Sequence, residues 1–340
     1  MIGNYLPQPK FNKNVWQFLA EKLAEHGWHI LTISSKENQF SRLLDMLNSI
    51  WKLRHTYTLA QVDVFSGKAF IFAQCCSLFL KMIHKPIVLT LHGGGLVGFA
   101  ESHSKQIKRV FDRATTIVTP SPFLQQSLKS FFEDIAVIPN PIKITDAIVR
   151  IRYNPKPVLI WVRAFHQIYN PLLVVQLASL LSSDFPNLEI LMIGPDKGDG
   201  SLARVKNEIS TLGLERHFKF IGGVKHEEIP TWLDKADIFI NTTNFDAAPR
   251  SVLEAMANGL CVVSTNVGGV PYIVEDGTEG LLVPPEDPQA MAEAIKKILI
   301  DPTLSSKLST NAHYKASLHD WSVILPQWEN LFMSIIKENL

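Results

Sequence analysis

The chain contains only three cysteines among its 340 residues. Cys75 and Cys76 are adjacent, and adjacent cysteines rarely bridge, so a disulfide framework of the kind found in small secreted domains is excluded. The best apolar run, residues 69–80, is about a dozen residues long, which is too short to cross a bilayer. The first 14 residues lack the apolar core of a signal peptide. These absences predict a protein of the reducing cytoplasm.

Several motifs of well-known sites are also missing. There is no Asp-x-Asp pair and no Cys/His cluster with zinc spacing, so the sequence predicts no metal site. It has no P-loop and no G-x-S-x-G turn, which argues against a P-loop nucleotidase and a serine hydrolase. It has no dense Lys/Arg stripe with interleaved aromatic residues, so nucleic acid is not a predicted partner.

Charge is unevenly distributed along a chain whose net charge is only +1. Residues 1–150 hold 17 Lys and Arg against 10 Asp and Glu, a net charge of +7, and the remainder has a net charge of −6. A basic first half is suited to an anionic membrane surface or a phosphorylated acceptor. The alternative is an ordinary solvated surface. We therefore expect a cytoplasmic protein with membrane association on the inner face.

Strand-like and helix-like runs alternate along the whole chain, which is typical of parallel α/β layers. The length and a hydrophobic content of 46% favour two domains, each a doubly wound Rossmann-like sheet. The turn-forming run IPNPIKITD separates the two blocks, and we place the boundary between 1–148 and 149–321. In the first block the expected helices are 15–26, 70–82, 104–112 and 122–131, and the expected strands are 28–34, 86–91, 116–119 and 135–138. In the second, the strands are 158–162, 188–193, 218–221, 238–241 and 261–264, and the helices are 171–181, 202–212, 228–235, one from 249, and 288–300.

Residues 241–285 carry the strongest functional signal. Asp246 lies in a turn, and Glu254 lies eight residues later inside a helix that Pro249 opens. The small or rigid residues Ala247, Ala248 and Pro249 let ligand atoms approach the backbone. A helix start offers free N–H groups and partial positive charge, which suit a phosphate. Taken singly, Asp246 is often only a turn residue and Glu254 only a solvated one.

As a block, this segment resembles the nucleotide-binding segment of the retaining glycosyltransferases of family 4, which have the two-domain GT-B fold. The family pattern is Glu, seven residues and Glu, followed by Ala-Met-Ala-x-Gly and a Gly-Gly-x-Pro-Glu-type loop. Here Asp246 replaces the first Glu, while EAMANG, GGVP (268–271) and DGTEGLLVPP (276–285) match closely. The resemblance also implies that the final helix, 322–340, packs back on the first domain. The apolar residues of 321–336 recur at helical spacing, as such a helix requires.

The resemblance implies a role for each candidate residue. Glu254 would bind the ribose hydroxyls and Asp246 the donor hexose. Arg163, at the end of the strand LIWV, would bind the departing diphosphate together with the helix start, that is Ala247, Ala248, Pro249, Arg250 and Ser251. The strand-end residues Gly194, Gly222 and Val224 would line the donor site. His92 would face the donor sugar, followed by the glycine loop Gly93, Gly94 and Gly95.

Two features depart from the family pattern. Family members carry a Lys about five residues after the strand-end Arg, whereas Ile168 and Tyr169 occupy that region here. Many members have Gly-Gly after the opening strand, whereas this chain has Lys10-Phe11-Asn12-Lys13-Asn14. His166, Lys197 and Lys225 are candidates to replace the missing cation.

The resemblance implies a retaining, metal-independent transfer of a hexose from a UDP- or GDP-linked sugar to a glycan or lipid-linked acceptor. The nucleotide sugar is a co-substrate, so no cofactor is expected. Two alternatives stay open. A non-catalytic nucleotide-sugar-binding relative would bind a nucleotide without turnover, and a GT-B sugar-nucleotide epimerase would convert the donor with no acceptor present.

Overall fold

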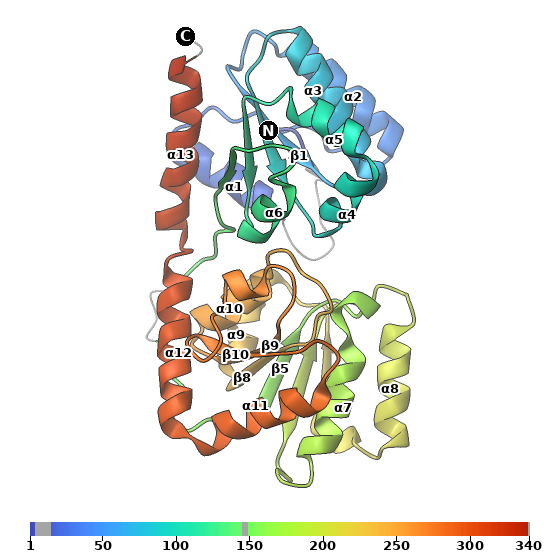
Figure 1. The fold of residues 1–340 in the computed structure, drawn as a ribbon, viewed down its shortest axis with the longest axis vertical. Helices are drawn as coiled ribbons and strands as arrows, with labels where there is room; N and C mark the ends of the chain where they lie inside the picture. Colours follow the sequence, from blue (N-terminus) through green and yellow to red (C-terminus); the bar gives the residue numbers. More distant parts are fainter. Residues whose placement is uncertain (4–14, 145–148, 339–340) are drawn as a thin grey trace. The chain divides into compact units, whose positions relative to one another are not determined.

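The computed structural model describes residues 1–3, 15–144 and 149–338, and the chain divides into two compact units (Figure 1). Unit 1 comprises Met1–Pro141 and Trp321–Leu340, and unit 2 comprises Ile142–Asp320. The first-loop residues Lys10–Asn14 lie outside the described residues. The expected boundary after residue 148 falls at the edge of another such stretch, 145–148. No helix of the described ranges is long and apolar enough to cross a membrane.

Unit 1 is built on a four-stranded parallel sheet with the strand order β1-β2-β3-β4. The strands are β1 (Ala60–Val64), β2 (Ile87–Leu91), β3 (Thr116–Thr119) and β4 (Ile135–Val137). Every residue of β1 and β2 is buried, as expected for parallel strands that helices cover on both faces. The carboxyl ends of these strands therefore lie at one edge of the sheet, where His92 directly follows β2.

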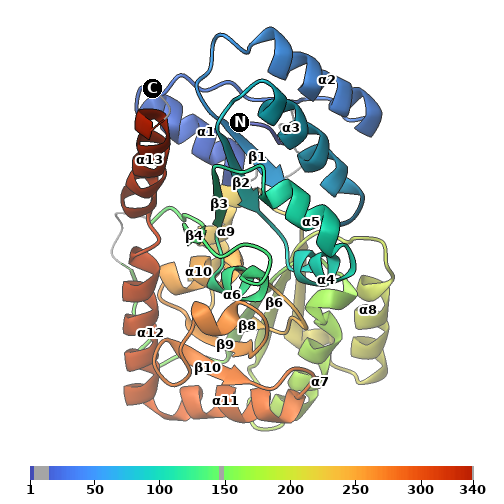
Figure 2. The same ribbon diagram turned by 45° about the horizontal axis from the view of Figure 1, so that its top comes forward.

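Helices cover both faces of the unit 1 sheet (Figures 1 and 2). They are α1 (Val15–Glu25), α2 (Gln39–Lys52), α3 (Phe70–Met82), α4 (Gly95–Ser102), α5 (Ser104–Phe111), α6 (Pro122–Leu128) and α13 (Trp321–Glu338). One core cluster joins the sheet to α2, α3 and α5, and a second joins it to α1 and α13. In the second cluster the rings of Trp16 and Trp328 meet edge to face, with centroids 5.8 Å apart. The final helix is thus a structural part of unit 1.

The structure corrects the sequence analysis of unit 1 in three places. The expected strand 28–34 is wrong, because only an isolated bridge from Ile33 to Ile2 forms there. The actual first strand, β1, was missed because Gln61 and Asp63 interrupt its apolar pattern, although both side chains are buried. Helix α2 was missed as well.

Unit 2 holds a six-stranded parallel sheet with the order β10-β9-β8-β5-β6-β7. Its strands are β5 (Val158–Val162), β6 (Glu189–Ile193), β7 (Phe218–Gly222), β8 (Ile238–Asn241), β9 (Cys261–Thr265) and β10 (Gly280–Val283). The strand order reverses between β5 and β8, which pair with each other at Leu159–Ile238 and Ile160–Phe239. Ligands of open α/β sheets bind at the carboxyl ends of the strands beside such a reversal.

Six α-helices of unit 2 lie on the two faces of this sheet. Helices α7 (Pro171–Leu181), α8 (Ser201–Thr211) and α11 (Pro288–Ile300) share one core cluster. Helices α9 (Ile229–Asp234), α10 (Arg250–Ala257) and α12 (Pro302–Ser317) share the other. Strand β10 and helix α12 were not predicted from the sequence. Both units nevertheless have the predicted architecture, a doubly wound parallel α/β sheet.

The three cysteines, Cys75, Cys76 and Cys261, are all free. Burial raises the pKa of the Cys76 and Cys261 thiols to about 12, so both stay protonated near neutral pH. These two cysteines therefore act as small apolar core residues.

Candidate functional site

The predicted donor-site residues of unit 2 follow the strands on both sides of the reversal in strand order. Arg163 comes directly after β5, and its N–H donates to the carbonyl of Ile193 at the end of β6 (3.0 Å). Asp246 lies in the segment that runs from the end of β8 to α10. Since β5 and β8 are neighbours in a parallel sheet, both residues lie at the same edge.

Arg163 and Asp246 form an ion pair, with 2.8 Å between Nη2 and Oδ2. Both side chains are largely buried, at 12% and 17% exposure, so water screens this pair less than a surface pair. The other carboxylate oxygen, Oδ1, accepts a hydrogen bond from the Ala248 N–H (3.0 Å). Asp246 thus connects the end of β5 to the turn that leads into α10, and it fixes the position of the guanidinium.

Tyr169, at the position where the sequence resemblance implies a Lys, also contacts Arg163. The guanidinium carbon lies 5.2 Å from the centre of the Tyr169 ring, within the range of a cation–π contact. Tyr169 ends a short 3₁₀ turn, Gln167–Tyr169. In this chain the residue at the lysine position supports the neighbouring Arg instead of adding a second positive charge.

The loop that carries Tyr169 is held by Asp199. The Asp199 carboxylate accepts hydrogen bonds from the N–H groups of Gln167 (2.8 Å) and Ser201 (3.0 Å). These backbone hydrogen bonds lower the pKa of Asp199 to about 2. His166, a candidate for the missing cation, lies in the same loop, where its Nδ1 accepts from the Ile168 N–H. That acceptor role requires Nδ1 to be unprotonated, so the ring is neutral in this arrangement.

The start of α10 is open toward polar groups. Pro249 is the N-cap residue and makes no side-chain capping hydrogen bond, while its carbonyl accepts from the N–H groups of Val252 (3.2 Å) and Leu253 (3.5 Å). The hydroxyl of Ser251, in that turn, is buried, as is the Nε of Arg163, and neither has a hydrogen-bond partner among the described residues. Buried polar groups left unpaired cost free energy. This concentration of unpaired donors is typical of an anion site.

The glycines around this site are required by backbone packing. A Cβ on Gly268 would lie 2.3 Å from the carbonyl oxygen of Asp246, and one on Gly269 would lie 1.8 Å from that of Ala247. The Gly269 N–H also donates to the Asp246 carbonyl (2.7 Å). The two glycines of the GGVP motif are therefore explained by their contact with the 246–247 backbone.

Gly194 has the same explanation, whereas Gly222 has a φ of +80° and open space where a Cβ would lie. A Cβ on Gly194, whose φ is +152°, would lie 1.7 Å from the carbonyl oxygen of Arg163. Its N–H donates to the carbonyl of Gly222 (2.9 Å), which ties the ends of β6 and β7 together. Val224 packs, partly buried, against the core on the α10 side of the sheet. These three residues therefore shape the strand ends near Arg163.

Glu254 is held by two residues through a single oxygen. Its Oε1 lies 2.7 Å from Nε2 of His226 and 2.8 Å from Nε of Arg250, one helical turn earlier in α10. The Glu254 side chain is only 15% exposed, so both contacts fix its orientation. The sequence analysis missed His226. The available signal was its place four residues after Gly222, at the carboxyl end of β7.

His92, in unit 1, is a buried residue with 8% exposure. Its Nε2 lies 3.1 Å from Oδ1 of Asp63, and its ring lies between those of Trp16 and Phe65, with centroid distances of 4.3 and 4.9 Å. A carboxylate only accepts hydrogen bonds, so Nε2 carries the proton and donates it to Asp63. The amide of Gln61 also donates to Asp63 Oδ1 (2.8 Å). The sequence analysis missed Asp63, whose only signal was a carboxylate inside an apolar run.

The glycine loop after His92 is shorter than expected. Gly93 has a φ of +77°, Gly94 is the N-cap of α4, and Gly95 is already the first residue of that helix. Gly93, Gly95 and Gly98 also have the G-x-G-x-x-G spacing of a dinucleotide-binding turn. No carboxylate follows β3, where such a site would bind the ribose, because the next residues are Pro120 and Ser121.

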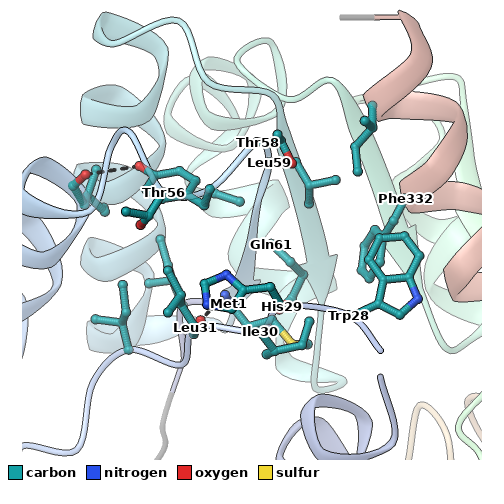
Figure 3. Close-up of a pocket in the computed structure, with 16 residues that line it drawn as sticks. Met1, Trp28, His29, Ile30, Leu31, Thr56, Thr58, Leu59, Gln61 and Phe332 are labelled. Carbon is teal, nitrogen blue, oxygen red and sulfur yellow. Dashed lines mark hydrogen bonds between the residues drawn. The ribbon is translucent and has the colours of Figure 1, made fainter. Parts of the chain in front are cut away.

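Unit 1 also contains a cavity of about 300 Å³, at the amino end of β1 (Figure 3). Its lining is mostly apolar and includes Trp28, Ile30, Leu59 and Phe332. His92 lies after the carboxyl end of the neighbouring parallel strand β2, at the opposite edge of the sheet. This cavity is therefore separate from the predicted site residues. In the described ranges, no group of three or more His, Cys, Asp or Glu side chains is arranged to hold a metal ion.

Comparison with known families and structures assigns most of the chain. Residues 146–315 match the model of the glycosyl transferases group 1, and residues 14–146 match that of Glycosyltransferase Family 4. Among curated relatives, the exopolysaccharide phosphotransferase SCO2592 of Streptomyces coelicolor is 34% identical over 143 residues, 41% of this chain and 15% of that protein. The D-inositol 3-phosphate glycosyltransferase of Corynebacterium urealyticum is 30% identical over 180 residues, 52% of this chain and 42% of that protein. The chain thus spans less than half the length of these two relatives.

Two solved structures share the fold along nearly the whole chain. Sucrose-phosphate synthase from Thermosynechococcus elongatus is 18% identical with a TM-score of 0.79, covering 99% of this chain and 98% of that one. HepE from Anabaena, solved in complex with UDP and glucose, is 19% identical with a TM-score of 0.73, covering 95% and 90%. The predicted GT-B fold is confirmed.

The packing of Gly269 against Ala247 gives a first test. Gly269→Ala forces a Cβ against the Ala247 carbonyl, so we expect destabilisation of about 1–3 kcal/mol, the cost typical of overpacking. Urea denaturation of the whole protein measures it. Gly98→Ala is the matched control, because a Cβ there meets nothing within 4 Å. Equal stability of the Gly269 variant and wild type would show that the two loops are not packed as described.

Proposed function

Because the chain belongs to the glycosyl transferases group 1 family, we propose that it moves a hexose from a UDP- or GDP-linked sugar to a glycan or lipid-linked acceptor. The donor site of this proposal lies in unit 2, at the carboxyl ends of β5 and β8. The nucleotide sugar acts as a co-substrate, and the proposal requires neither a cofactor nor a metal ion. Polysaccharide biosynthesis is the process we propose for it, in keeping with the name of the Streptomyces relative.

The observation that carries this proposal is the ion pair of Arg163 and Asp246 beside the uncapped start of α10. A guanidinium and the amino end of a helix, with its partial positive charge, are two independent features that bind phosphate. The third feature is the pair of buried donors, on Arg163 and Ser251, that have no hydrogen-bond partner among the described residues. Acceptor atoms of a ligand could bind these donors after a small side-chain movement, which would offset the free-energy cost of leaving them unpaired. A sugar nucleotide has its diphosphate at the bond that breaks.

This arrangement favours the transition state over the bound donor. When the bond between the sugar and the diphosphate breaks, negative charge grows on the leaving oxygen. Donors fixed in place before the reaction stabilise that charge without reorganising, and only such differential binding accelerates the step. In the proposed reaction Arg163 and the first turn of α10 stabilise the charge on the leaving oxygen. Asp246 acts as a positioning residue, since both of its oxygens are already engaged by Arg163 and Ala248.

The engagement of Asp246 supports transfer with retention and without a covalent intermediate. A carboxylate that pairs with a guanidinium and a backbone N–H is a poor nucleophile, because attack on the sugar would break both contacts. We therefore propose that the acceptor attacks on the same face that the diphosphate leaves, and that a diphosphate oxygen takes the acceptor proton. The shorter Asp246, in place of the family Glu, fits a residue that reaches only to Arg163.

Glu254 is the proposed ligand of the ribose hydroxyls. Its contacts with His226 and Arg250 hold the carboxylate in one orientation, as a residue that accepts hydrogen bonds from a diol requires. We propose that the nucleotide base binds beside the neighbouring strand ends, at Gly194, Gly222 and Val224. His92 is the residue of unit 1 for which we propose a role in turnover, with Asp63 fixing its tautomer. UDP is the first nucleotide to test, because HepE was solved with it.

One observation favours a second candidate, a relative that binds nucleotide sugars without catalysis. Tyr169 stands at the lysine position, so the diphosphate faces one side-chain cation where the family has two. The contact between Tyr169 and Arg163 holds this one cation in place, which is compatible with turnover.

Nucleotide binding is tested by thermal denaturation with UDP, GDP and their glucose conjugates. A ligand at a hundred times its Kd adds about 2.7 kcal/mol to the free energy of unfolding, so we expect a higher Tm with one nucleotide series. Release of that nucleotide only when a glycan or lipid-linked acceptor is present would support the transferase. Binding without turnover would favour the second candidate, and donor conversion without acceptor would indicate an epimerase. An unchanged Tm with every nucleotide would rule out the proposed site.

The roles of Arg163 and Glu254 are tested by turnover. We expect Arg163→Ala and Glu254→Gln each to lower kcat/KM at least about a hundredfold, the typical loss when a charge-stabilising donor is removed. Lys219→Ala is a matched control, because Lys219 pairs with Glu189 on the surface of the same unit. Near wild-type turnover in both site variants would remove these assignments.

A further inference from the structure

Helices α2 and α3 of unit 1 expose an unusual amount of large apolar side chain. Of the sixteen large apolar residues that are exposed among the described residues, six lie on these two helices. They are Phe40, Leu44 and Trp51 on α2 and Ile71, Leu78 and Met82 on α3, with exposures from 45% to 71%. We call these six residues the α2–α3 surface. Scattered exposed apolar residues are normal, but such a concentration marks an interaction surface.

The spacing shows that each helix has a second apolar side besides the one in the core. On α3, residues 71, 78 and 82 follow one another at helical intervals of i, i+7 and i+11, which places them on one face. The core side of the same helix is made by Ala73, Cys76 and Leu80. On α2, residues 40, 44 and 51 also share a face, while Met46 and Ile50 are buried. Folding of unit 1 alone does not account for the exposed faces.

The two helices are neighbours, as Figures 1 and 2 show from two directions. Trp51 of α2 stacks on Phe79 of α3 with ring centroids 6.2 Å apart. The guanidinium of Arg54 lies over the Trp51 ring, 3.9 Å from its centroid. A basic group therefore borders the apolar residues at the end of α2.

The charge of the segment identifies the partner. Residues 39–85 contain six Lys and Arg but only two carboxylates, Asp45 and Asp63. Asp63 is buried beside His92, so Asp45 is the one carboxylate of this segment that can offset the positive charge at its surface. Two copies of such a basic surface repel each other, whereas an anionic bilayer attracts it.

We propose that the α2–α3 surface docks the protein on an anionic membrane, with its apolar side chains in the boundary between head groups and acyl chains. Apolar residues bordered by Lys and Arg are the pattern of elements that lie in this boundary rather than span the bilayer. This inference goes beyond the proposed function, since it concerns where unit 1 binds and not what unit 2 transfers. Its test uses no catalysis.

Flotation of the whole protein with lipid vesicles tests the docking surface. We expect wild type to float with vesicles of phosphatidylcholine and phosphatidylglycerol, to stay behind with phosphatidylcholine alone, and to float less as salt increases. The triple variant Ile71→Ser, Leu78→Ser, Met82→Ser should lower the vesicle-bound to free ratio about tenfold or more, because it removes the inserted apolar surface. A second variant, Lys52→Glu with Lys81→Glu, tests the charge independently.

The matched control is Ile300→Ser with Tyr314→Ser, which removes apolar residues that are even more exposed, at 73% and 68%, from unit 2. It should float like wild type. The nucleotide-dependent Tm shift of each variant separates loss of docking from loss of folding. Failure of wild type to float, or undiminished flotation of both the apolar triple variant and the charge variant, would overturn the proposal. So would an equal loss in the control, or a dimer in sedimentation that the triple variant dissociates.

Discussion

The ion pair between Arg163 and Asp246 is the contact on which the candidate site depends. It joins the ends of β5 and β8, the two strands at which the order of the unit 2 sheet reverses, and it is shielded from water. A guanidinium at such a position would be mobile without a partner. With Asp246 on one side and the Tyr169 ring on another, it has a fixed place beside the first turn of α10. The proposed anion-binding site thus depends on the topology of the sheet together with three side chains.

The surrounding loops explain why this contact is well defined. Gly268 and Gly269 pack on the backbone of Asp246 and Ala247, and Gly194 packs on that of Arg163. At these positions a Cβ would collide with backbone, which cannot move as the end of a side chain does. The glycines of the family-like motif therefore shape the site indirectly. The same reasoning extends to Glu254, whose orientation depends on His226 and Arg250 rather than on its helix alone.

The sequence predicted the architecture well because apolar runs of strand length alternate with helical ones, and many boundaries, such as those of α3, α7 and β8, agree with the structure. It failed at β1, where the buried Gln61 amide donates a hydrogen bond to the buried Asp63 carboxylate, a contact that no local pattern reveals. It failed at 28–34 because an apolar segment there lacks strand partners beyond one bridge. His226 and Asp63 were missed because their partners are 28 and 29 residues away in the chain. The exposed sides of α2 and α3 were invisible for a related reason, since exposure depends on which helix faces the sheet covers.

The most direct test of the central claim is a double-mutant cycle on the affinity for the nucleotide that binds, measured by calorimetry with Arg163→Ala, Asp246→Ala and the combined variant. If Asp246 acts by positioning the guanidinium, Asp246→Ala should change the nucleotide affinity little when Arg163 is already replaced. The account therefore predicts that the two effects are not additive, with a coupling free energy of about 1 kcal/mol or more, as for residues in contact. Effects that add to within about 0.5 kcal/mol would show that the two residues act independently and would contradict it.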